Sequence, residues 1–545
     1  MFPYAEERFS PDEQAVLRRY VTNLDLPVFA LVNLPEVVKG ALFARYSRSP
    51  KSLRRLFLDE FVGDLDVSGD ASVDATVGLS RAEQLYERVF VEYGDDSVAQ
   101  LGGVHLACEQ SSNILSKVLE WGRLMAYLEQ STRYIAYNQR LENGQYRYYR
   151  PPELLESPHG ARYVGEMDRV FDTYGALLPQ MQAWVAERFP QQSGDSDFVY
   201  RQATKAKSLD ALRGLLPAAS LSNIGMYGTG QSYEQLLLRM RAHPLPEART
   251  YAEMMLTELR KVIPSFLQRV DVAERGGEWS AYLEATRSGT ARLIARLWPD
   301  VATDRWDGVE ENQPEVILLD FDPQGEEKIL VAACFSHLDC SEREASRRVA
   351  ELGHDDRVGL LRAYIGERRN RRHRPGRAFE RTGYRFELIT DYGAFRDLQR
   401  HRMLTIQWQP LTPDLGAGIP EQVRDARCGE DYERALSISA GEYERLRDAG
   451  LADAAPYALC LAFRIRYILD LNARAAMQLI ELRSGREGHP AYRAVAHEMR
   501  EQIASVHPTV AAAMAHVDTA TEPRLERILS EMRSHSRVAG SSQAR

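Results

Sequence analysis

Cysteine is scarce in this sequence, and its spacing fits no cysteine-based framework. The 545 residues include five cysteines, and no two of them form a Cys-x-x-Cys pair. An odd number without paired spacing argues against a disulfide scaffold and a zinc ribbon. The twelve histidines form no His-x-x-x-His or His-Glu-x-x-His pair, so we expect no catalytic metal.

Long apolar runs and an excess of basic residues are also missing. The stretch Tyr457–Phe463 is among the longest apolar runs and is far too short to cross a bilayer. The first residues show no basic region followed by an apolar run, so no signal peptide is expected. The net charge of −9, from 69 basic and 78 acidic residues, gives no global attraction to nucleic acid. We therefore expect a cytoplasmic protein with neither a membrane nor a nucleic-acid partner.

A compact group of cations lies at Arg400-His401-Arg402, after the amphipathic run 392–398. Two guanidinium groups around one imidazole suit a bound anion, because the planar fork matches phosphate oxygens and stays charged. A solvated helix surface would have the same composition, so the triplet alone leaves both interpretations open.

The length of the chain predicts more than one domain. A turn-rich, acidic composition at 286–315 indicates a linker between a domain at 1–285 and a second at 316–530. The Ser-, Arg- and Gly-rich tail at 531–545 is expected to be disordered. Apolar spacing predicts helices at 36–46, 104–128, 161–189, 230–241 and 246–261, and a strand at 316–321.

The two halves share blocks of sequence in the same order. The block Asn472-Ala-Arg474, which leads to Arg483, parallels Gly228-Thr-Gly230, which leads to Arg239. Gly353-His-Asp-Asp parallels Gly94-Asp-Asp-Ser, and Gly122-Arg123 parallels His401-Arg402. This order indicates two homologous units of about 250 residues, although chance similarity among Leu/Arg helices is the alternative for any single block.

These blocks resemble the flavin-dependent thymidylate synthase family, whose signature is Arg-His-Arg-x-x-Ser followed by Asn-Glu-x-Ser-x-Arg-Tyr. The second half has the front of the signature at 400–405 and departs from it at Gln407, Trp408, Pro410 and Thr412. The first half has the back of the signature at 129–134, with Trp121 and Gly122 in place of the first Arg and His. The family's Asn-Ala-Arg helix is intact only in the second half. Each half has thus lost residues that the other keeps.

The resemblance implies an α+β fold, with two fused family-like domains that each combine a mixed sheet with long helices. It implies FAD as cofactor, and methylenetetrahydrofolate and NADPH as co-substrates, for reductive methylation of a uridine nucleotide of the dUMP-to-dTMP type. Because the family's site forms in a homotetramer, a fused chain is expected to form a homodimer that mimics it.

The resemblance also assigns the site residues. Those expected to bind the flavin are Arg400, His401, Arg402, Thr405, Asn472, Arg474 and Gln478. Those expected to bind the nucleotide are Arg123, Glu129, Ser131, Arg133, Arg239 and Arg483, of which Arg239 and Arg483 are the catalytic candidates. A guanidinium near the uracil would stabilise negative charge that develops on the ring.

Two other functions fit parts of the sequence. A relative that binds FAD or a nucleotide without methylation would keep the same cations, and the departures in the second half leave the substrate open. An RNA-associated protein would use the basic run 368–377, which lacks interleaved aromatic residues for base stacking.

Overall fold

The computed structural model describes residues 4–520 and 525, except residues 6, 35, 61–99, 101, 194–195, 300–308 and 311–314. It divides into two compact units, each built from three stretches of the chain. Unit 1 contains Met1–Gly175, Leu216–Asp304 and Ser437–Leu459, and unit 2 contains Ala176–Leu215, Arg305–Leu436 and Cys460–Arg545. Each unit therefore includes sequence from both halves. The Gly94 block and the predicted tail lie outside the described residues.

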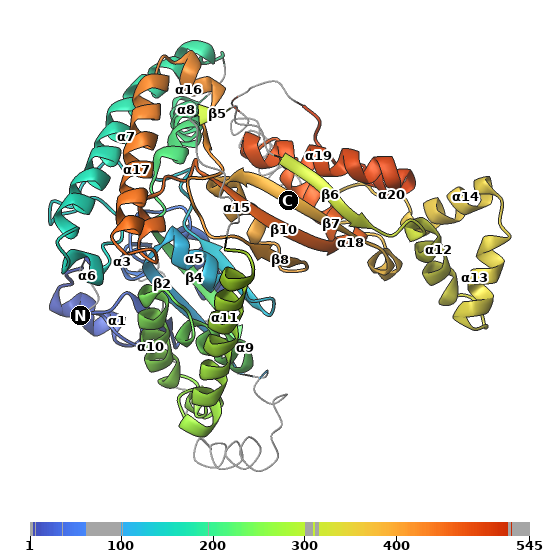
Figure 1. Ribbon diagram of the computed structural model, residues 1–545, viewed down its shortest axis with the longest axis horizontal. Coiled ribbons are helices and arrows are strands. Elements are labelled where there is room, and N and C mark those ends of the chain that lie inside the picture. The colour runs from blue at the N-terminus through green and yellow to red at the C-terminus, as the bar shows by residue number, and fades with distance from the viewer. Residues whose placement is uncertain are drawn as a thin grey trace, which may run out of the picture. The chain divides into compact units, whose positions relative to one another are not determined.

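Unit 1 is organised around a four-stranded antiparallel sheet in the order β1-β2-β4-β3 (Figure 1). Its strands are β1 (Val28–Leu31), β2 (Gly103–Ser112), β3 (Met125–Glu129) and β4 (Leu221–Thr229). Helix α5 (Asn113–Leu119) follows β2 directly, and α9 (Gly230–Arg241) follows β4 directly. Apolar side chains of the first three helices, among them Leu42, Phe43 and Leu56, form a core with Phe29 of the sheet.

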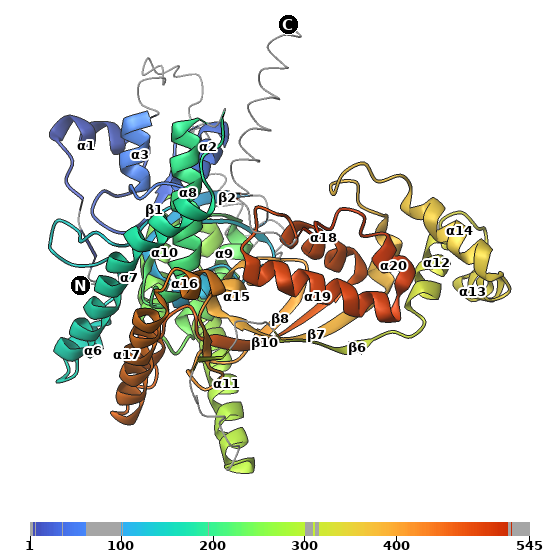
Figure 2. The ribbon, with the colours of Figure 1, turned by 90° about the horizontal axis from the view of Figure 1, so that it is seen from above.

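Unit 2 repeats this arrangement with a four-stranded antiparallel sheet in the order β6-β7-β10-β8. Its strands are β6 (Glu315–Phe321), β7 (Gly383–Asp391), β8 (Thr405–Trp408) and β10 (Arg464–Asn472). Helix α15 (Tyr392–Gln399) follows β7, and α18 (Ala473–Arg483) follows β10. Helices α18 and α19 (Pro490–Val506) lie along one side of this sheet (Figure 2). The α+β class and the internal repeat predicted from the sequence are therefore confirmed.

The same capping pattern joins strand to helix in both units. Thr229 and Asn472 are the N-caps of α9 and α18, and each accepts an amide hydrogen from the residue three positions later. The first amide of α9 donates to Gly102 O, and the first amide of α18 to Thr382 O, each at 2.9 Å. Side-chain capping satisfies amides that a helix start otherwise leaves without partners. The strand–helix junctions are thus equivalent in atomic detail.

This equivalence corrects the sequence comparison by one residue. Because Thr229 caps as Asn472 does, Thr229 rather than Gly228 is the counterpart of Asn472. Arg239 is the tenth residue after its cap, whereas Arg483 is the eleventh after Asn472. The two helix sequences align without a gap, so sequence comparison alone could not reveal this shift of one residue. The structure reveals it, because the strand–helix junctions fix which residues correspond.

The remaining elements complete the two units. The helices are α1 (Pro11–Leu17), α2 (Glu36–Tyr46), α3 (Leu53–Glu60), α6 (Pro152–Leu155), α7 (Gly160–Arg188), α8 (Asp197–Leu212), α10 (Pro246–Arg260), α11 (Glu278–Leu297), α12 (Gly325–Phe335), α13 (Glu342–Ala350), α14 (His354–Ile365), α16 (Glu421–Asp425), α17 (Gly429–Asp448) and α20 (Pro508–Ala512). Short helical turns are η4 (Arg213–Leu215), η5 (Pro264–Leu267), η6 (Ala273–Gly277), η7 (Arg377–Arg381) and η8 (Ala455–Ala458), and β5 (Val309–Glu310) pairs with β9 (Ala417–Gly418).

Two sequence predictions differ from the structure. The predicted helix 104–128 is instead strand β2, helix α5 and most of β3, because β2 is the inner strand between β1 and β4 and tertiary pairing outweighs helix propensity. The predicted linker 286–315 begins inside α11, which continues to Leu297. Within the described residues, no helix is both long and apolar enough to span a membrane.

Candidate functional site

Three arginines of unit 2 converge on one carboxylate. Asp397, in α15, accepts a hydrogen bond from Arg213 Nη1 at 3.2 Å and forms a close ion pair with Arg400. Arg483 Nη1, in the last turn of α18, lies 3.8 Å from Asp397 Oδ1. Arg213 and Arg483 are 5% and 15% exposed at their side chains, so these charges are largely desolvated. We call Arg213, Asp397, Arg400 and Arg483 the arginine cluster.

The arginine cluster carries more positive than negative charge. Three guanidinium groups share Asp397, and the second nearby carboxylate, Asp391 Oδ1, lies 3.7 Å from Arg213. Asp391 also caps α15 by accepting the Ala394 amide at 2.9 Å. Guanidinium groups form strong, directional hydrogen bonds with carboxylates and phosphates. The arrangement is therefore suited to an anionic ligand.

His401 is held as a neutral ring beside the arginine cluster. Its Nε2 accepts the Nε hydrogen of Arg483 at 2.8 Å, so Nε2 cannot also carry a proton. Burial lowers the pKa of His401 well below its usual value, and Arg483 and Arg400 lower that pKa further. This geometry keeps His401 uncharged and able to donate only through Nδ1.

The other predicted flavin residues serve local roles or are exposed. Asn472 caps α18 through a 2.8 Å bond from the Ala475 amide. Arg474 donates to Pro375 O at 3.0 Å and lies 3.4 Å from Glu380. Arg402 and Thr405 are exposed on the segment after α15, and Gln478 is half-buried on α18.

In unit 1, the loop after α5 meets the last turn of α9. The Arg239 guanidinium lies 4.9 Å from the ring centroid of Trp121, which is 45% exposed. Burial lowers the pKa of Arg239. In the repeat, Trp121 stands at the place of Arg400, so an indole here occupies the place of a guanidinium of the arginine cluster.

Two of the predicted nucleotide residues of unit 1, Glu129 and Ser131, have partners within that unit. Glu129 is buried and lies 3.3 Å from Lys117 Nζ, which also pairs with Glu120 at 2.5 Å. Ser131 accepts the Arg133 amide at 3.3 Å and donates its own amide to Ser47 O at 3.0 Å. Arg123 is exposed, and Arg133 is half-buried.

Sequence reasoning missed two members of the arginine cluster. Asp397 stands inside the amphipathic run that precedes Arg400, where a carboxylate reads as part of a solvated face. Arg213 lies 184 residues before Asp397 and belongs to the short turn η4. Asp397 could have been found from its three-residue spacing to Arg400, a helical neighbour distance. No local signal points to Arg213.

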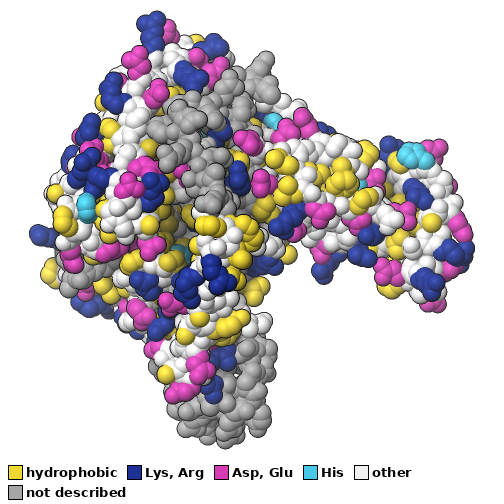
Figure 3. Space-filling model, viewed as in Figure 1, with side chains coloured by type: hydrophobic (Ala, Val, Ile, Leu, Met, Phe, Trp, Pro, Cys, Tyr) yellow, Lys and Arg dark blue, Asp and Glu magenta, His cyan; other side chains and the backbone are white. Residues whose placement is uncertain are grey.

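The basic run 368–377 is partly structural. Arg368 donates two hydrogen bonds to the carboxylate of Glu481, at 2.8 and 2.6 Å, and its side chain is 3% exposed. Arg377 pairs with Glu380 at 2.9 Å. On the face that Figure 3 shows, basic and acidic side chains are interspersed. These pairs weaken the case for RNA binding, because Arg368 at least is unavailable to a polyanion.

The described residues contain no group of three or more His, Cys, Asp or Glu side chains arranged to hold a metal ion. They do contain donors that fit the phosphate groups of FAD or of a nucleotide. Arg213 Nη2 is buried and donates no hydrogen bond to a described atom, and the cluster has cationic charge in excess. These donors suit phosphate oxygens.

The chain matches one family in two segments and several proteins over nearly its full length. The family is described as thymidylate synthase complementing protein, and the matched residues are 47–265 and 317–509. A UPF0159 protein of Chlamydia muridarum is 38% identical over 533 residues, covering 97% of this chain and 99% of the relative. A UPF0159 protein of Thermoplasma acidophilum is 30% identical over 529 residues, covering 92% and 99%.

A solved structure has weaker similarity. It is a UMP/dUMP methylase, PolB, from Streptomyces cacaoi, bound with 5-Br dUMP. It is 20% identical, has a TM-score of 0.33, and covers 39% of this chain and 100% of its own. Each segment matched by the family contains most of one four-stranded sheet and both of its strand–helix junctions. From these matches, the chain belongs to the thymidylate synthase complementing protein family.

Proposed function

We propose that this protein methylates a uridine nucleotide at C5 in a flavin-dependent reaction. The carbon would come from methylenetetrahydrofolate and the electrons from NADPH. Family membership supports the reaction class, and the arginine cluster is the observation that carries the assignment to this chain. A nucleotide or a flavin dinucleotide brings phosphate charge that such a cluster can neutralise.

Arg400, Arg402 and Arg213 are the proposed phosphate-binding groups, with Arg474, Asn472, Gln478 and Thr405 as further flavin contacts. FAD, when bound, would supply hydride transfer, which is chemistry of the cofactor rather than of the protein. Arg213 and Arg400 gain a fixed orientation from Asp397, and preorganised donors lose little freedom when they bind.

Arg483 is the proposed electrostatic catalyst. Burial lowers its pKa, and Asp397 at 3.8 Å and His401 at 2.8 Å hold its guanidinium in place. A fixed cation in a desolvated site stabilises negative charge that develops on a uracil ring as C5 becomes nucleophilic. Arg239 is the second catalytic candidate, and Arg123, Ser131 and Arg133 are proposed nucleotide contacts.

The test combines a visible absorption spectrum with a methylation assay on dUMP and UMP, supplied with methylenetetrahydrofolate and NADPH. We expect flavin absorbance in the purified or FAD-loaded protein and a C5-methylated product. Arg483→Gln should lower kcat by about 100-fold or more while flavin is retained. Arg434→Gln, an exposed arginine paired with Asp431 in unit 2, is the control. A colourless protein that takes up no FAD and forms no product would overturn the proposal.

One observation favours a relative that binds FAD or a nucleotide without methylation. Glu129, a proposed substrate contact, is paired in a buried site with Lys117, which also holds Glu120. A carboxylate held in this way is not available to the substrate unless the pair opens. Flavin absorbance without product from dUMP or UMP would identify this second function.

A further inference from the structure

Helix α11 of unit 1 carries large apolar side chains that the unit does not cover. Its 20 residues, Glu278–Leu297, all belong to the described part of the chain, and none of them is buried. Six large apolar side chains of this helix and its C-cap are between 46% and 65% exposed: Trp279, Tyr282, Leu293, Ile294, Leu297 and Trp298. A contiguous apolar surface of this kind marks a site of interaction.

Most of these side chains lie on one side of α11. At about 100° per residue, positions 279, 282, 283, 286, 290, 293, 294 and 297 fall within about 120° of the helix circumference. We call the residues at these positions the α11 stripe. The contacts that hold α11 against α9 and its C-cap come from another side of the helix. Ser280 Oγ donates to Leu238 O at 3.4 Å, and Arg287 Nη1 donates to Ala242 O at 2.5 Å.

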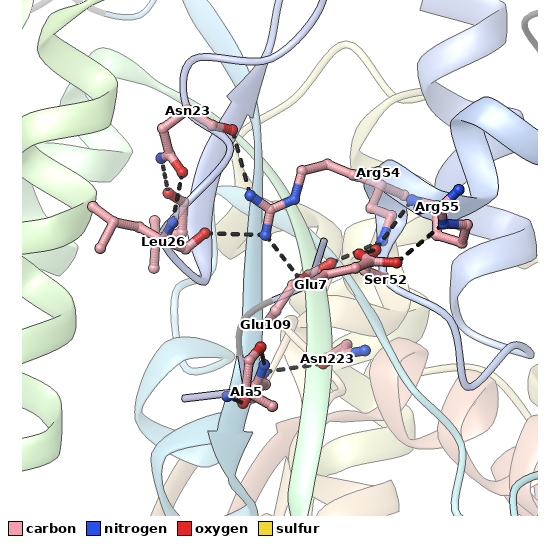
Figure 4. A network of polar contacts seen from close by, with 12 residues as sticks. Ala5, Glu7, Asn23, Leu26, Ser52, Arg54, Arg55, Glu109 and Asn223 are labelled. Atoms are coloured by element: carbon pink, nitrogen blue, oxygen red, sulfur yellow. Dashed lines mark hydrogen bonds and ion pairs between the residues drawn. The ribbon is translucent and has the colours of Figure 1, made fainter. Parts of the chain in front are cut away.

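The fold of unit 1 has other sources of stability than the α11 stripe. The segments matched by the family end at 265 and resume at 317, so α11 lies outside them. Elsewhere in the unit, even a charged network is enclosed. Arg54 is 4% exposed at its side chain, donates to Leu26 O at 3.2 Å and lies 3.6 Å from Glu109 (Figure 4). Substitutions on the stripe are therefore expected to leave the unit folded.

The α11 stripe is symmetric about Ser288. Trp279 and Leu297 lie nine residues to either side of it, and Tyr282 and Ile294 lie six residues to either side. The remaining positions of the stripe also form pairs, at five and at two residues from Ser288. In an antiparallel pair of α11 helices with a two-fold axis at the level of Ser288, each large apolar side chain therefore meets another of the second copy.

The charges beside the α11 stripe fit the same arrangement. Glu278 and Arg296 are 18 residues apart, about five turns of helix, so both lie on the same edge of the stripe. Glu278 is ten residues before Ser288 and Arg296 is eight after it. The two-fold axis therefore brings Glu278 of one copy beside Arg296 of the other. Opposite charges at these places favour the antiparallel pair.

The size of the α11 stripe also suits a second copy. Its five large exposed side chains each leave about half of their surface uncovered. At roughly 200 Å² for a large side chain, two such stripes remove on the order of 1,000 Å² from water when they meet, which is the size at which specific interfaces begin.

We infer that the α11 stripe is a contact between two copies of this chain, in which the α11 helices pack antiparallel and centred on Ser288. The apolar positions form the middle of the contact, and Glu278 and Arg296 flank it. Because α11 lies outside the matched family segments, this contact is additional to those that the family resemblance implies. It requires neither flavin nor methylation activity.

The test is disulfide cross-linking of the full chain under mild oxidation. Cys334 and Cys340, the native cysteines that are not buried, are first replaced by serine, and Trp279→Cys and Leu297→Cys are then introduced together. The two positions lie about 27 Å apart along one helix, too far for a disulfide, but they face each other between antiparallel copies. We expect a covalent dimer on a non-reducing gel. Leu297→Cys alone should give none, because its two copies lie at opposite ends of the pair.

Two further substitutions in the double-cysteine variant locate the contact. Leu293→Glu should slow cross-linking at least tenfold, because it places a charge in the apolar contact. Ala295→Glu changes an exposed position on the other side of the same helix and should leave the rate unchanged. Thermal melts should show every variant folded.

Three outcomes overturn the inference. If the double-cysteine variant gives no covalent dimer, even where light scattering shows a dimer, the copies meet through another surface. If Leu297→Cys alone cross-links as fast, the helices do not pack antiparallel. If Leu293→Glu and Ala295→Glu cross-link at equal rates, the stripe is not the contact. A failed methylation assay has no bearing on any of these results.

Discussion

Asp397 is the residue on which the geometry of the arginine cluster depends. Removing one partner of a buried ion pair leaves the other charge desolvated and unpaired, which costs about 3–5 kcal/mol. Arg213 is 5% exposed and would keep only Asp391, at 3.7 Å. We therefore expect Asp397→Ala to lower the free energy of unfolding by about 3 kcal/mol, measured by urea denaturation.

The control for that experiment is an exposed pair of the same unit. Asp470 lies 3.2 Å from Arg385, and the two side chains are 50% and 40% exposed. Exposed pairs contribute about 0–1 kcal/mol, so Asp470→Ala should have a small effect. If the two variants lose equal stability, Asp397 does not hold the cluster.

Glu247 gives unit 1 a pH dependence of opposite sign to that of ordinary carboxylates. Burial raises its pKa to about 7, while Ser112 and Tyr457 donate hydrogen bonds to it and oppose that rise. The folded state then holds a proton that the unfolded state releases near pH 4.5. The contribution of protonated Glu247 to the free energy of unfolding is complete below that pH. It is lost as the pH rises to about 7, which lowers the free energy of unfolding by about 3 kcal/mol.

The measurement is the difference in unfolding free energy between the unaltered protein and Glu247→Gln, from pH 4.5 to pH 7.5. Because glutamine does not ionise, the unaltered protein should lose stability relative to the variant as pH rises. A difference that stays constant across this range contradicts a raised pKa at Glu247.

The residues of the candidate site were easier to predict from the sequence than their protonation and their ion-pair partners. Arg400, His401 and Arg483 follow from a motif, and the structure brings them together with Asp397. That His401 is neutral follows from burial and from the hydrogen of Arg483, which no sequence pattern encodes. Glu129 likewise belongs to the back of the motif, yet its carboxylate pairs with Lys117.

Elements with clear helical periodicity were predicted almost residue by residue. Helices α2 and α9 have the bounds that apolar spacing predicted, and α9 is amphipathic and begins at the N-cap Thr229. Strand β2 was missed because its pairing with β1 and β4, up to 126 residues away (Gly103 with Thr229), decides its conformation. Short strands after helices, such as β3, carry too few residues to show a period of two.

The strand–helix junction at Asn472 offers a test that separates structure from binding. Replacing an N-cap by alanine costs about 1 kcal/mol, whereas serine caps about as well as asparagine. Asn472→Ala should lower the unfolding free energy by about that amount, and Asn472→Ser should not. If Asn472 also contacts FAD, both variants should lose flavin absorbance. If only the alanine variant loses flavin, the residue acts through the helix start alone.

At the scale of the whole molecule, the repeat predicts an oligomer. The family's sites form in a tetramer of single-domain chains, so a chain with two such units is expected to dimerise. Light scattering should give twice the chain mass at micromolar concentration. A monomer that retains full activity would show that fusion alone replaces the ancestral assembly.

The two halves have kept different cations, and this divergence predicts a division of labour. Arg400 belongs to the arginine cluster, whose excess charge suits the flavin phosphates, while Arg133 belongs to the motif remnant of the first half. Arg400→Ala should abolish flavin absorbance. Arg133→Ala should keep the absorbance and raise KM for the uridine nucleotide at least tenfold, since one charge-assisted hydrogen bond is worth about 1.5–3 kcal/mol. Arg18→Ala, an exposed arginine of unit 1, should change neither quantity. If flavin content and KM are indifferent to both Arg400→Ala and Arg133→Ala, the cations that survive in each half are remnants of ancestry and the ligands bind elsewhere.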